Sequence, residues 1–237
     1  MDHSKRGLWP IIMSAVLTAG MYVAVTGLLF GPTLHWPISS RTWALSGSSC
    51  FVLLSAAIAV RFRQRAAWLT LMGLIACWLG DYLGPIHFQA GACSFLVAHL
   101  LFIAAWTWTG PNWKKSAATL GVVLLATTGI GTWLLPSVPN GDIPLVVAYM
   151  SVISLMVAVA GGIRGPLRRL TLLGAVLFYV SDIAVARGQY VTPGALNSWI
   201  CYPLYYTACL LLAYSAWLPQ GTAESTGWIT SAEGSVP

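Results

Sequence analysis

Residues 67–83 read AWLTLMGLIACWLGDYL, an apolar run with a single charged residue, Asp81. A run of this kind is typical of a helix that crosses a lipid bilayer, which needs roughly 20 apolar residues. An ionised carboxylate in such a helix costs about 2.5–3.5 kcal/mol on insertion scales unless it faces a polar cavity or a partner. The stretch therefore predicts a membrane helix and makes Asp81 a candidate functional group.

The whole chain has the composition of an integral membrane protein. Of its 237 residues, 57% are hydrophobic and 8% are charged, and the mean hydropathy is +0.76, which is unusual for a soluble domain. We predict an all-α, polytopic membrane bundle within residues 1–218, followed by a disordered C-terminal tail at 219–237, which is rich in Ser, Thr and Gly. The eight predicted transmembrane helices are 8–29, 43–60, 67–83, 90–109, 117–135, 144–160, 170–187 and 197–218.

The basic residues alternate between the two sides of this predicted bundle. Only Arg41 and Arg187 fall in the loops of one side. Because cytoplasmic loops carry an excess of Lys and Arg, the pattern predicts that both termini are cytoplasmic. The net charge of +6 then reflects topology, and we expect no nucleic-acid partner. The other ten basic residues lie in the N-terminus and every second loop: Lys5, Arg6, Arg61, Arg63, Arg65, Lys114, Lys115, Arg164, Arg168 and Arg169.

Two acids lie inside predicted spans, Asp81 and Asp182. A glycine precedes each by eight residues, Gly73 and Gly174, which hints at a repeat of four plus four helices. From the span ends we expect both carboxyl groups within about 5–8 Å of the outer edge of the hydrocarbon. Paired acids in a desolvated site are one way to keep a general acid protonated, although each could instead be polar glue between helices. Asp142 lies in an outer loop, where a turn explains it.

Other polar side chains also lie within the spans. His99 sits in the middle of FLVAHLLFIAAW, and Tyr205 and Tyr206 lie too deep for an interfacial aromatic belt. Tyr149 lies near the outer end of its span, and Ser181 adjoins an aspartate. One histidine and two distant aspartates do not form the clustered spacing of a zinc site. We therefore predict no metal and no cofactor.

Four stretches resemble, in order and spacing, the motifs of the YhhN/TMEM86 family: GLIACWLGDYLG at 73–84, FQAGACSFLVAHLLFIAAW at 88–106, GAVLFYVSDIAVA at 174–186 and YYTACLLLAYSA at 205–216. The resemblance implies an eight-span membrane protein in a bacterial inner membrane or a eukaryotic endomembrane. It also implies lysoplasmalogenase activity, which is hydrolysis of the vinyl-ether bond of lysoplasmalogens to a fatty aldehyde and a glycerophospho-alcohol. The polar residues that it marks are Asp81, His99, Asp182, Tyr205 and Tyr206, with Ser181 beside an acid.

Vinyl-ether hydrolysis requires one acid and one base, as glycoside hydrolysis does. We predict that Asp81 and Asp182 fill these roles, in an order that the residues leave open. Arg41 or Arg187 could meet the substrate phosphate, and the expected partners are a lysophospholipid substrate and membrane lipids. The alternatives are a small-molecule or proton-coupled carrier and a non-catalytic lipid-binding protein. The predicted substrate-binding residues are His99, Tyr149, Ser181, Tyr205 and Tyr206.

Overall fold

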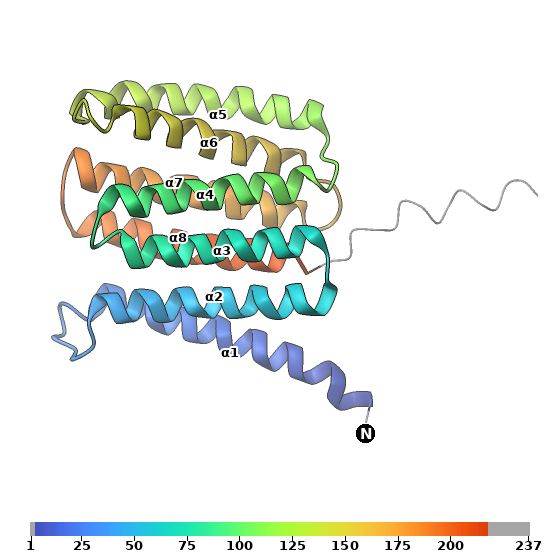
Figure 1. Ribbon diagram of the computed structural model, residues 1–237. Coiled ribbons are helices and arrows are strands. Elements are labelled where there is room, and N and C mark those ends of the chain that lie inside the picture. The colour runs from blue at the N-terminus through green and yellow to red at the C-terminus, as the bar shows by residue number, and fades with distance from the viewer. Residues whose placement is uncertain (1–2, 218–237) are drawn as a thin grey trace, which may run out of the picture.

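The computed structural model describes residues 3–217, which form eight α-helices and one short 3₁₀ helix (Figure 1). Each predicted span coincides with one helix to within a few residues, because each is a long apolar run bounded by polar or turn-forming residues. The predicted tail at 219–237 lies outside the described residues. The elements are α1 (His3–Phe30), α2 (Ser40–Phe62), α3 (Arg65–Leu83), α4 (Phe88–Thr107), α5 (Trp113–Leu134), η1 (Leu135–Ser137), α6 (Ile143–Gly162), α7 (Arg168–Tyr190) and α8 (Ala195–Ser215).

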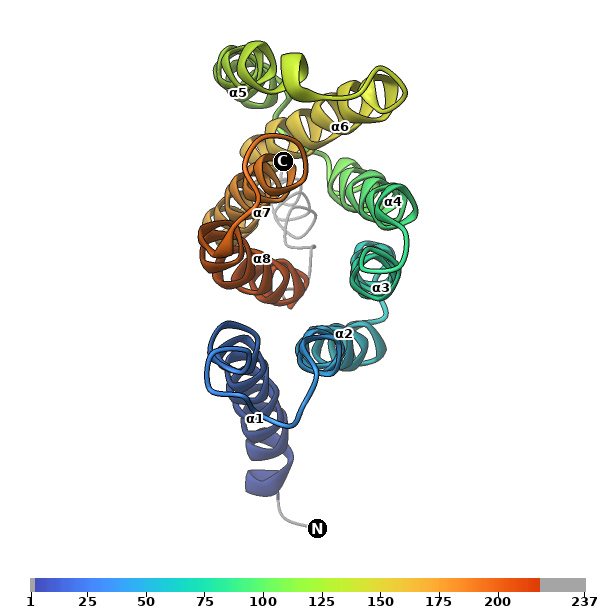
Figure 2. The same ribbon diagram turned by 90° about the vertical axis from the view of Figure 1, so that its left-hand side faces the viewer.

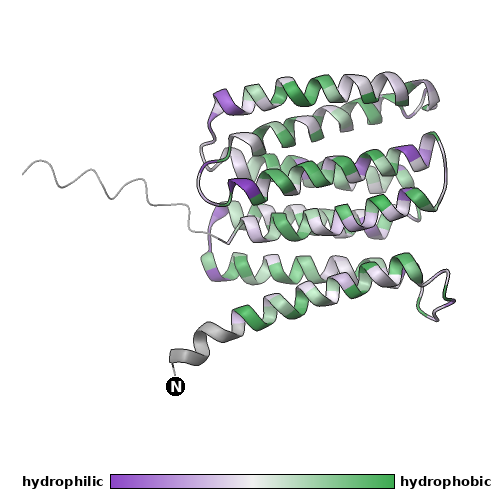
Figure 3. Ribbon diagram, turned by 180° about the vertical axis from the view of Figure 1, so that it is seen from behind, coloured by the Kyte–Doolittle hydropathy of each residue, from purple (hydrophilic) through white to green (hydrophobic). Residues whose placement is uncertain are grey.

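Among the described residues, seven helices are long and apolar enough to cross a membrane. The remaining helix, α8, has 21 residues but contains Asn197, Pro203 and several tyrosines, which make it more polar. Apolar side chains cover most of the helix lengths, and hydrophilic residues gather at the helix ends (Figure 3). The fold is therefore that of a multi-pass membrane protein.

The helices run side by side around a common centre (Figures 1 and 2). Helices α2, α3 and α4 form one wall, α7 and α8 form the opposite wall, and α6 closes one side between α4 and α7. Helix α1 packs against α2 and α8, while α5 packs mainly against α6 at the periphery. The centre of the bundle is therefore built from α2–α4 and α6–α8.

The connections α2–α3, α4–α5 and α6–α7 lie at one end of the bundle, together with the start of α1 and the end of α8 (Figure 1). We call this the basic end, and the opposite end the far end. The far end holds the α1–α2, α3–α4, α5–α6 and α7–α8 connections. The charge alternation of the sequence therefore corresponds to the two ends of one bundle. The basic residues in or beside the three connections are Arg61, Arg63, Arg65, Lys114, Lys115, Arg164, Arg168 and Arg169.

Small residues let the central helices approach closely. A Cβ added at Gly73 of α3 would lie 2.5 Å from the Phe102 ring of α4, and one at Gly174 of α7 would lie 2.9 Å from Leu212 of α8. Phe102 and Leu212 are fully buried, so neither has free space to move into. Each glycine lies about two helical turns before the aspartate of its own helix, on the side of the basic end. The contacts there fix α3 against α4 and α7 against α8.

Candidate active site

A cavity of about 320 Å³ lies toward the far end of the bundle, with walls mainly from α3, α4, α6, α7 and α8 and single contributions from Ala44 of α2 and from Ile130 and Leu134 of α5. Its volume falls within the range of small-molecule sites. Apolar and aromatic side chains make up most of the lining, which suits a hydrocarbon chain. Of the described residues that line it, only Asp81 and Asp182 carry a carboxyl group. The structure thus brings the two intramembrane acids, 101 positions apart in the sequence, to one cavity.

Asp81 lies in the last turn of α3, where two hydroxyl groups donate to its Oδ2 atom. One donor is Ser48 Oγ of α2, and the other is the Tyr205 hydroxyl of α8, at 2.9 Å. Ser48 is fully buried and Tyr205 nearly so. Hydrogen bonds to a carboxylate are among the stronger ones in proteins. Two neighbouring helices, α2 and α8, therefore hold Asp81 in place through one carboxyl oxygen.

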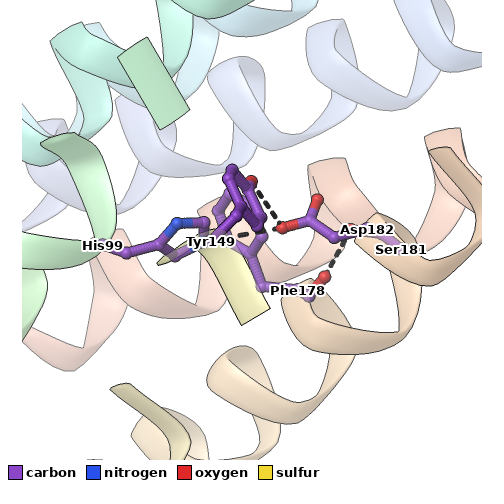
Figure 4. Close-up of polar contacts among 5 residues, drawn as sticks. All are labelled: His99, Tyr149, Phe178, Ser181 and Asp182. Atoms are coloured by element: carbon purple, nitrogen blue, oxygen red, sulfur yellow. Dashed lines mark hydrogen bonds and ion pairs between the residues drawn. The ribbon is translucent and has the colours of Figure 1, made fainter. Parts of the chain in front are cut away.

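Asp182 lies on α7 and has a different set of neighbours (Figure 4). The Tyr149 hydroxyl of α6 donates to its Oδ2 atom at 2.8 Å, and His99 Nε2 of α4 lies 3.6 Å from the same oxygen. The Asp182 side chain is 17% exposed, whereas His99 is fully buried. The imidazole meets Tyr149 and Phe178 edge to face, at 5.2 and 4.8 Å between ring centroids. His99 therefore supports Asp182 from behind, away from the cavity.

Two of the other predicted site residues have mainly structural contacts. Tyr206 lines the cavity with its ring, but its hydroxyl donates to the Ala44 carbonyl of α2 at 2.9 Å. Ser181 does not reach the cavity: it is fully buried, and its hydroxyl donates to the Phe178 carbonyl of its own helix at 2.7 Å (Figure 4). Adjacent residues on a helix point about 100° apart, so a serine beside Asp182 faces another neighbour.

The structure departs from the sequence-based geometry in the length of α7. Helix α7 continues to Tyr190, three residues beyond the predicted span, so Asp182 lies eight residues or about 12 Å from the end of its helix. Asp81 lies only two residues from the end of α3. The two acids therefore lie at different distances from their helix ends, and the depth of about 5–8 Å below the hydrocarbon edge stays a prediction for both. Both acids still line one cavity, because α7 extends farther toward the far end than α3 does (Figure 1).

Asp142 is held by more than the predicted turn. It is the N-cap residue of α6 and accepts hydrogen bonds from Gln89 Nε2 of α4 and from the Tyr190 hydroxyl of α7, both at 3.2 Å. It does not line the cavity. This acid joins three helices at the far end, and it gives a matched control for the two acids of the cavity.

The two arginines at the far end differ in their surroundings. The Arg41 guanidinium lies over the Tyr82 ring, 4.3 Å from its centroid, and its side chain is exposed. Arg187 Nη1 donates to Asn197 Oδ1 at 2.6 Å, which ties α7 to the start of α8. Arg41 is therefore the more available of the two for an anionic ligand.

Sequence reasoning missed Ser48 as a partner of Asp81. The segment 46–49 reads SGSS, and nothing in it distinguishes one hydroxyl from the next. The structure separates them: Ser48 Oγ reaches Asp81, while Ser49 accepts a hydrogen bond from Trp78 Nε1 at 3.2 Å.

Within the part of the chain that the structure describes, no group of three His, Cys, Asp or Glu residues could hold a metal ion.

A multi-pass bundle whose central cavity holds two hydrogen-bonded carboxyl groups defines an integral membrane protein with a candidate acid–base site. The family model of the YhhN family matches residues 41–216, and the chain belongs to this family. It is 25% identical over 202 residues to lysoplasmalogenase TMEM86A of Bos taurus, a match that covers 77% of this chain and 82% of the bovine protein. No solved structure gives a significant match. The family match starts at Arg41, so α1 lies outside it.

Proposed function

We propose that this protein is an intramembrane lysoplasmalogenase, which hydrolyses the vinyl-ether bond of a lysoplasmalogen to a fatty aldehyde and a glycerophospho-alcohol. The observation that carries the proposal is the placement of Asp81 and Asp182 on one apolar cavity. Similarity to a bovine protein named a lysoplasmalogenase supports the choice of substrate. Membership in the YhhN family rests on the family match, and the coarser conclusion, a membrane hydrolase, rests on the bovine relative.

The two carboxyl groups supply what the reaction requires. A vinyl ether is cleaved when an acid protonates its β-carbon, which leaves an oxocarbenium ion. Water then adds to this ion, and the resulting hemiacetal collapses to aldehyde and alcohol. Glycosidases pass through a similar cation between two carboxyl groups, one acting as acid and the other as base or nucleophile. In this proposal, one of Asp81 and Asp182 protonates the vinyl carbon and the other stabilises the cation and activates water.

The position of the cavity suits a lysolipid. In such a lipid the vinyl-ether bond lies directly below the glycerol, a few ångströms under the headgroup, and the cavity lies toward the far end of the bundle. The hydrocarbon chain would occupy the apolar lining. Arg41 precedes the lining residue Ala44 by about one helical turn, from where its guanidinium can meet the substrate phosphate.

The proposal includes a membrane topology, in which all eight helices cross the membrane and both termini lie in the cytoplasm. The positive-inside rule assigns the basic end to the cytoplasm and the far end to the outer side. One cysteine at a time, at Asn112 or at Asn140, tests this assignment when it is introduced with Cys93→Ser, which removes the exposed native thiol. Labelling is measured against the Cys93→Ser protein without the added cysteine. In sealed right-side-out vesicles, an impermeant thiol reagent should label position 140 and spare position 112. The reverse labelling would invert the topology.

A carrier is less well supported by the same cavity. A carrier needs its acidic groups to be reached alternately from both sides of the membrane. Here the fully buried side chains of Phe102, Phe178 and Leu212 fill the bundle between the aspartates and the basic end. The cavity therefore favours chemistry at one side over transport through the bundle.

The test is aldehyde release by the purified protein and its Asp81→Asn and Asp182→Asn variants. Each variant should lose about 100-fold or more of the rate, the contribution expected of a positioned acid or base. Asp142→Asn is the matched control and should retain near-normal activity, because Asp142 lies outside the cavity. Full activity in both cavity variants would refute the acid–base pair. Cleavage of an acyl lysophospholipid in place of the vinyl ether would identify a lysophospholipase.

A further inference from the structure

The two halves of the bundle are packed in the same way around the two aspartates. Helix α3 packs on α4 as α7 packs on α8, and α2 packs on α3 as α6 packs on α7. The contact of α4 with α6 has its counterpart in the contact of α8 with α2, and the α1–α2 pair corresponds to α5–α6. The outermost helices differ, since α1 also contacts α8 while α5 contacts α7. The helices α2, α3 and α4 around Asp81 therefore correspond to α6, α7 and α8 around Asp182, four helices later in the chain.

Individual residues follow the same relation. Gly73 faces Phe102 and Gly174 faces Leu212, so a shift of 101 positions relates α3 to α7 and a shift of 110 positions relates α4 to α8. These shifts place His99 at the position of Cys209. The contacts agree: the Cys77 thiol of α3 meets the Cys209 thiol of α8, and Phe178, the counterpart of Cys77, meets His99.

The polar neighbours of the two acids break this symmetry. Ser48 and Tyr149 occupy corresponding positions on α2 and α6, and each donates one hydrogen bond to its aspartate. The counterpart of Tyr205 on α4 is Phe95, whose ring lines the cavity and has no hydroxyl to donate. Asp81 thus receives two hydroxyl donors. The polar neighbours of Asp182 besides Tyr149 are the His99 imidazole and the Ser181 hydroxyl, which donates to the Phe178 carbonyl.

The two environments suit different protonation states. Hydroxyl donors stabilise a carboxylate anion, and Asp81 has two of them on one oxygen. Neither ring nitrogen of His99 makes a well-formed hydrogen bond among the described residues. Its Nε2 lies 3.6 Å from Asp182, and the backbone carbonyl of Phe95 approaches the ring. When the ring proton is on Nδ1, Nε2 is an acceptor, which a protonated Asp182 can satisfy.

We propose that Asp182 is the general acid of the reaction, that His99 is the positioning residue for its proton, and that Asp81 is the carboxylate that stabilises the cation and activates water. This assignment rests on the lysoplasmalogenase function proposed above. It explains why the site has two acids with unequal surroundings: one must hold a proton in the resting enzyme and the other must not.

The proton transfers balance over one cycle. Asp182 gives its proton to the vinyl β-carbon as the C=C electron pair forms the new C–H bond, which leaves an oxocarbenium ion beside the Asp81 carboxylate. Water bonds to the cationic carbon and passes a proton to Asp81. The hemiacetal then breaks its bond to the glycerol oxygen, which takes the proton from Asp81, while the hemiacetal hydroxyl returns a proton to Asp182. The products are an aldehyde and an alcohol, and both acids regain their starting states.

Deuterium exchange in D₂O tests the assignment. With Asp81→Asn, the cation still forms but water capture is slowed, so the cation returns its β-hydrogen or β-deuterium to Asp182. Recovered lysoplasmalogen should therefore carry deuterium at the vinyl β-carbon, as mass spectrometry can measure. With Asp182→Asn the β-carbon is not protonated, so recovered substrate should carry none. Exchange in Asp182→Asn only, or in neither variant, would overturn the assignment.

Milder variants provide a second measurement that does not depend on loss of a carboxyl group. His99→Asn should lower hydrolysis and exchange together, because both begin with the proton of Asp182. Tyr205→Phe should lower hydrolysis and raise the ratio of exchange to hydrolysis, because it weakens the water-activating carboxylate alone. An unchanged ratio in Tyr205→Phe, as expected of a merely structural role, would overturn the assignment of Asp81, and a ratio changed by His99→Asn would overturn the assignment of His99 to the proton of Asp182. Thermal unfolding in detergent shows that each variant is folded.

The failure of this assignment differs from the failure of the proposed function. If the wild-type protein releases no aldehyde from lysoplasmalogen, the proposed function fails and the exchange pattern has no bearing on it. If the wild-type protein releases aldehyde but the exchange pattern is reversed, the function stands and the roles of Asp81 and Asp182 are exchanged.

Discussion

Helices α3 and α5 are both long and apolar enough to cross a membrane, yet 50% of the apolar window of α3 is buried against 11% of that of α5. Helix α3 presents glycines and Asp81 to its neighbours, and an added Cβ at its Gly73 would meet Phe102. The glycines of α5 at 121 and 129 face open space. Hydropathy thus identifies both helices as spans, whereas small and polar residues decide which one lies at the centre.

The largest effect should come from removing a side chain that packs on α3. Phe102→Ala deletes a fully buried ring, and we expect a loss of about 3–5 kcal/mol in the free energy of unfolding. Leu125→Ala on α5 is the control, because that side chain is 78% exposed and its removal should change stability by less than about 0.5 kcal/mol. Unfolding by SDS titration from mixed micelles measures both. Equal losses would show that α5 is packed as tightly as α3.

An intermediate effect is expected from adding one methyl group to each helix. Gly73→Ala places a Cβ 2.5 Å from the Phe102 ring, and overpacking of this kind should cost about 1–3 kcal/mol of unfolding free energy. In Gly129→Ala the new methyl group meets nothing within 4 Å, so the higher helix propensity of alanine should leave stability unchanged or raise it by up to about 1 kcal/mol. The same SDS titration compares the two. A neutral Gly73→Ala would mean that α3 and α4 are free to separate.

The spans and the two acids were predictable because each is a local signal. An apolar run identifies a span without knowledge of its neighbours, and a carboxyl group in such a run is conspicuous because it is costly there. Tyr205 could be selected as a candidate for the same reason, because a hydroxyl group deep in an apolar helix needs a hydrogen-bond partner. In the structure that partner is Asp81.

The pairing of residues between helices was not predictable from the sequence. The contact of His99 with Asp182 joins α4 to α7, and no periodicity within either helix specifies that they face each other. Ser48 is one of several serines in α2, and only the packing of α2 on α3 selects it. Ser181, which the sequence places beside Asp182, points elsewhere because adjacent helical residues diverge. The sequence therefore predicted which helices carry the polar residues better than it predicted which way their side chains point.

The smallest effect concerns the hydrogen bonds that join Thr127 of α5 to α6 and α7. Thr127 hydrogen-bonds Ser154 of α6 at 2.8 Å and the hydroxyl of Tyr179 of α7, which lines the cavity, at 2.7 Å. Thr127→Val keeps the shape and removes both bonds, and hydrogen bonds between membrane helices contribute about 0.6 kcal/mol each. Thr128→Val is the control, because Thr128 is exposed and bonds the Leu124 carbonyl of its own helix. We expect Thr127→Val to lower the unfolding free energy by about 1 kcal/mol and Thr128→Val to leave it unchanged. If both variants unfold like the wild type, the hydrogen bonds of Thr127 do not stabilise the protein, and α5 is held to the bundle by apolar packing. The difference between the central helix α3 and the peripheral helix α5 would then be larger than these hydrogen bonds indicate.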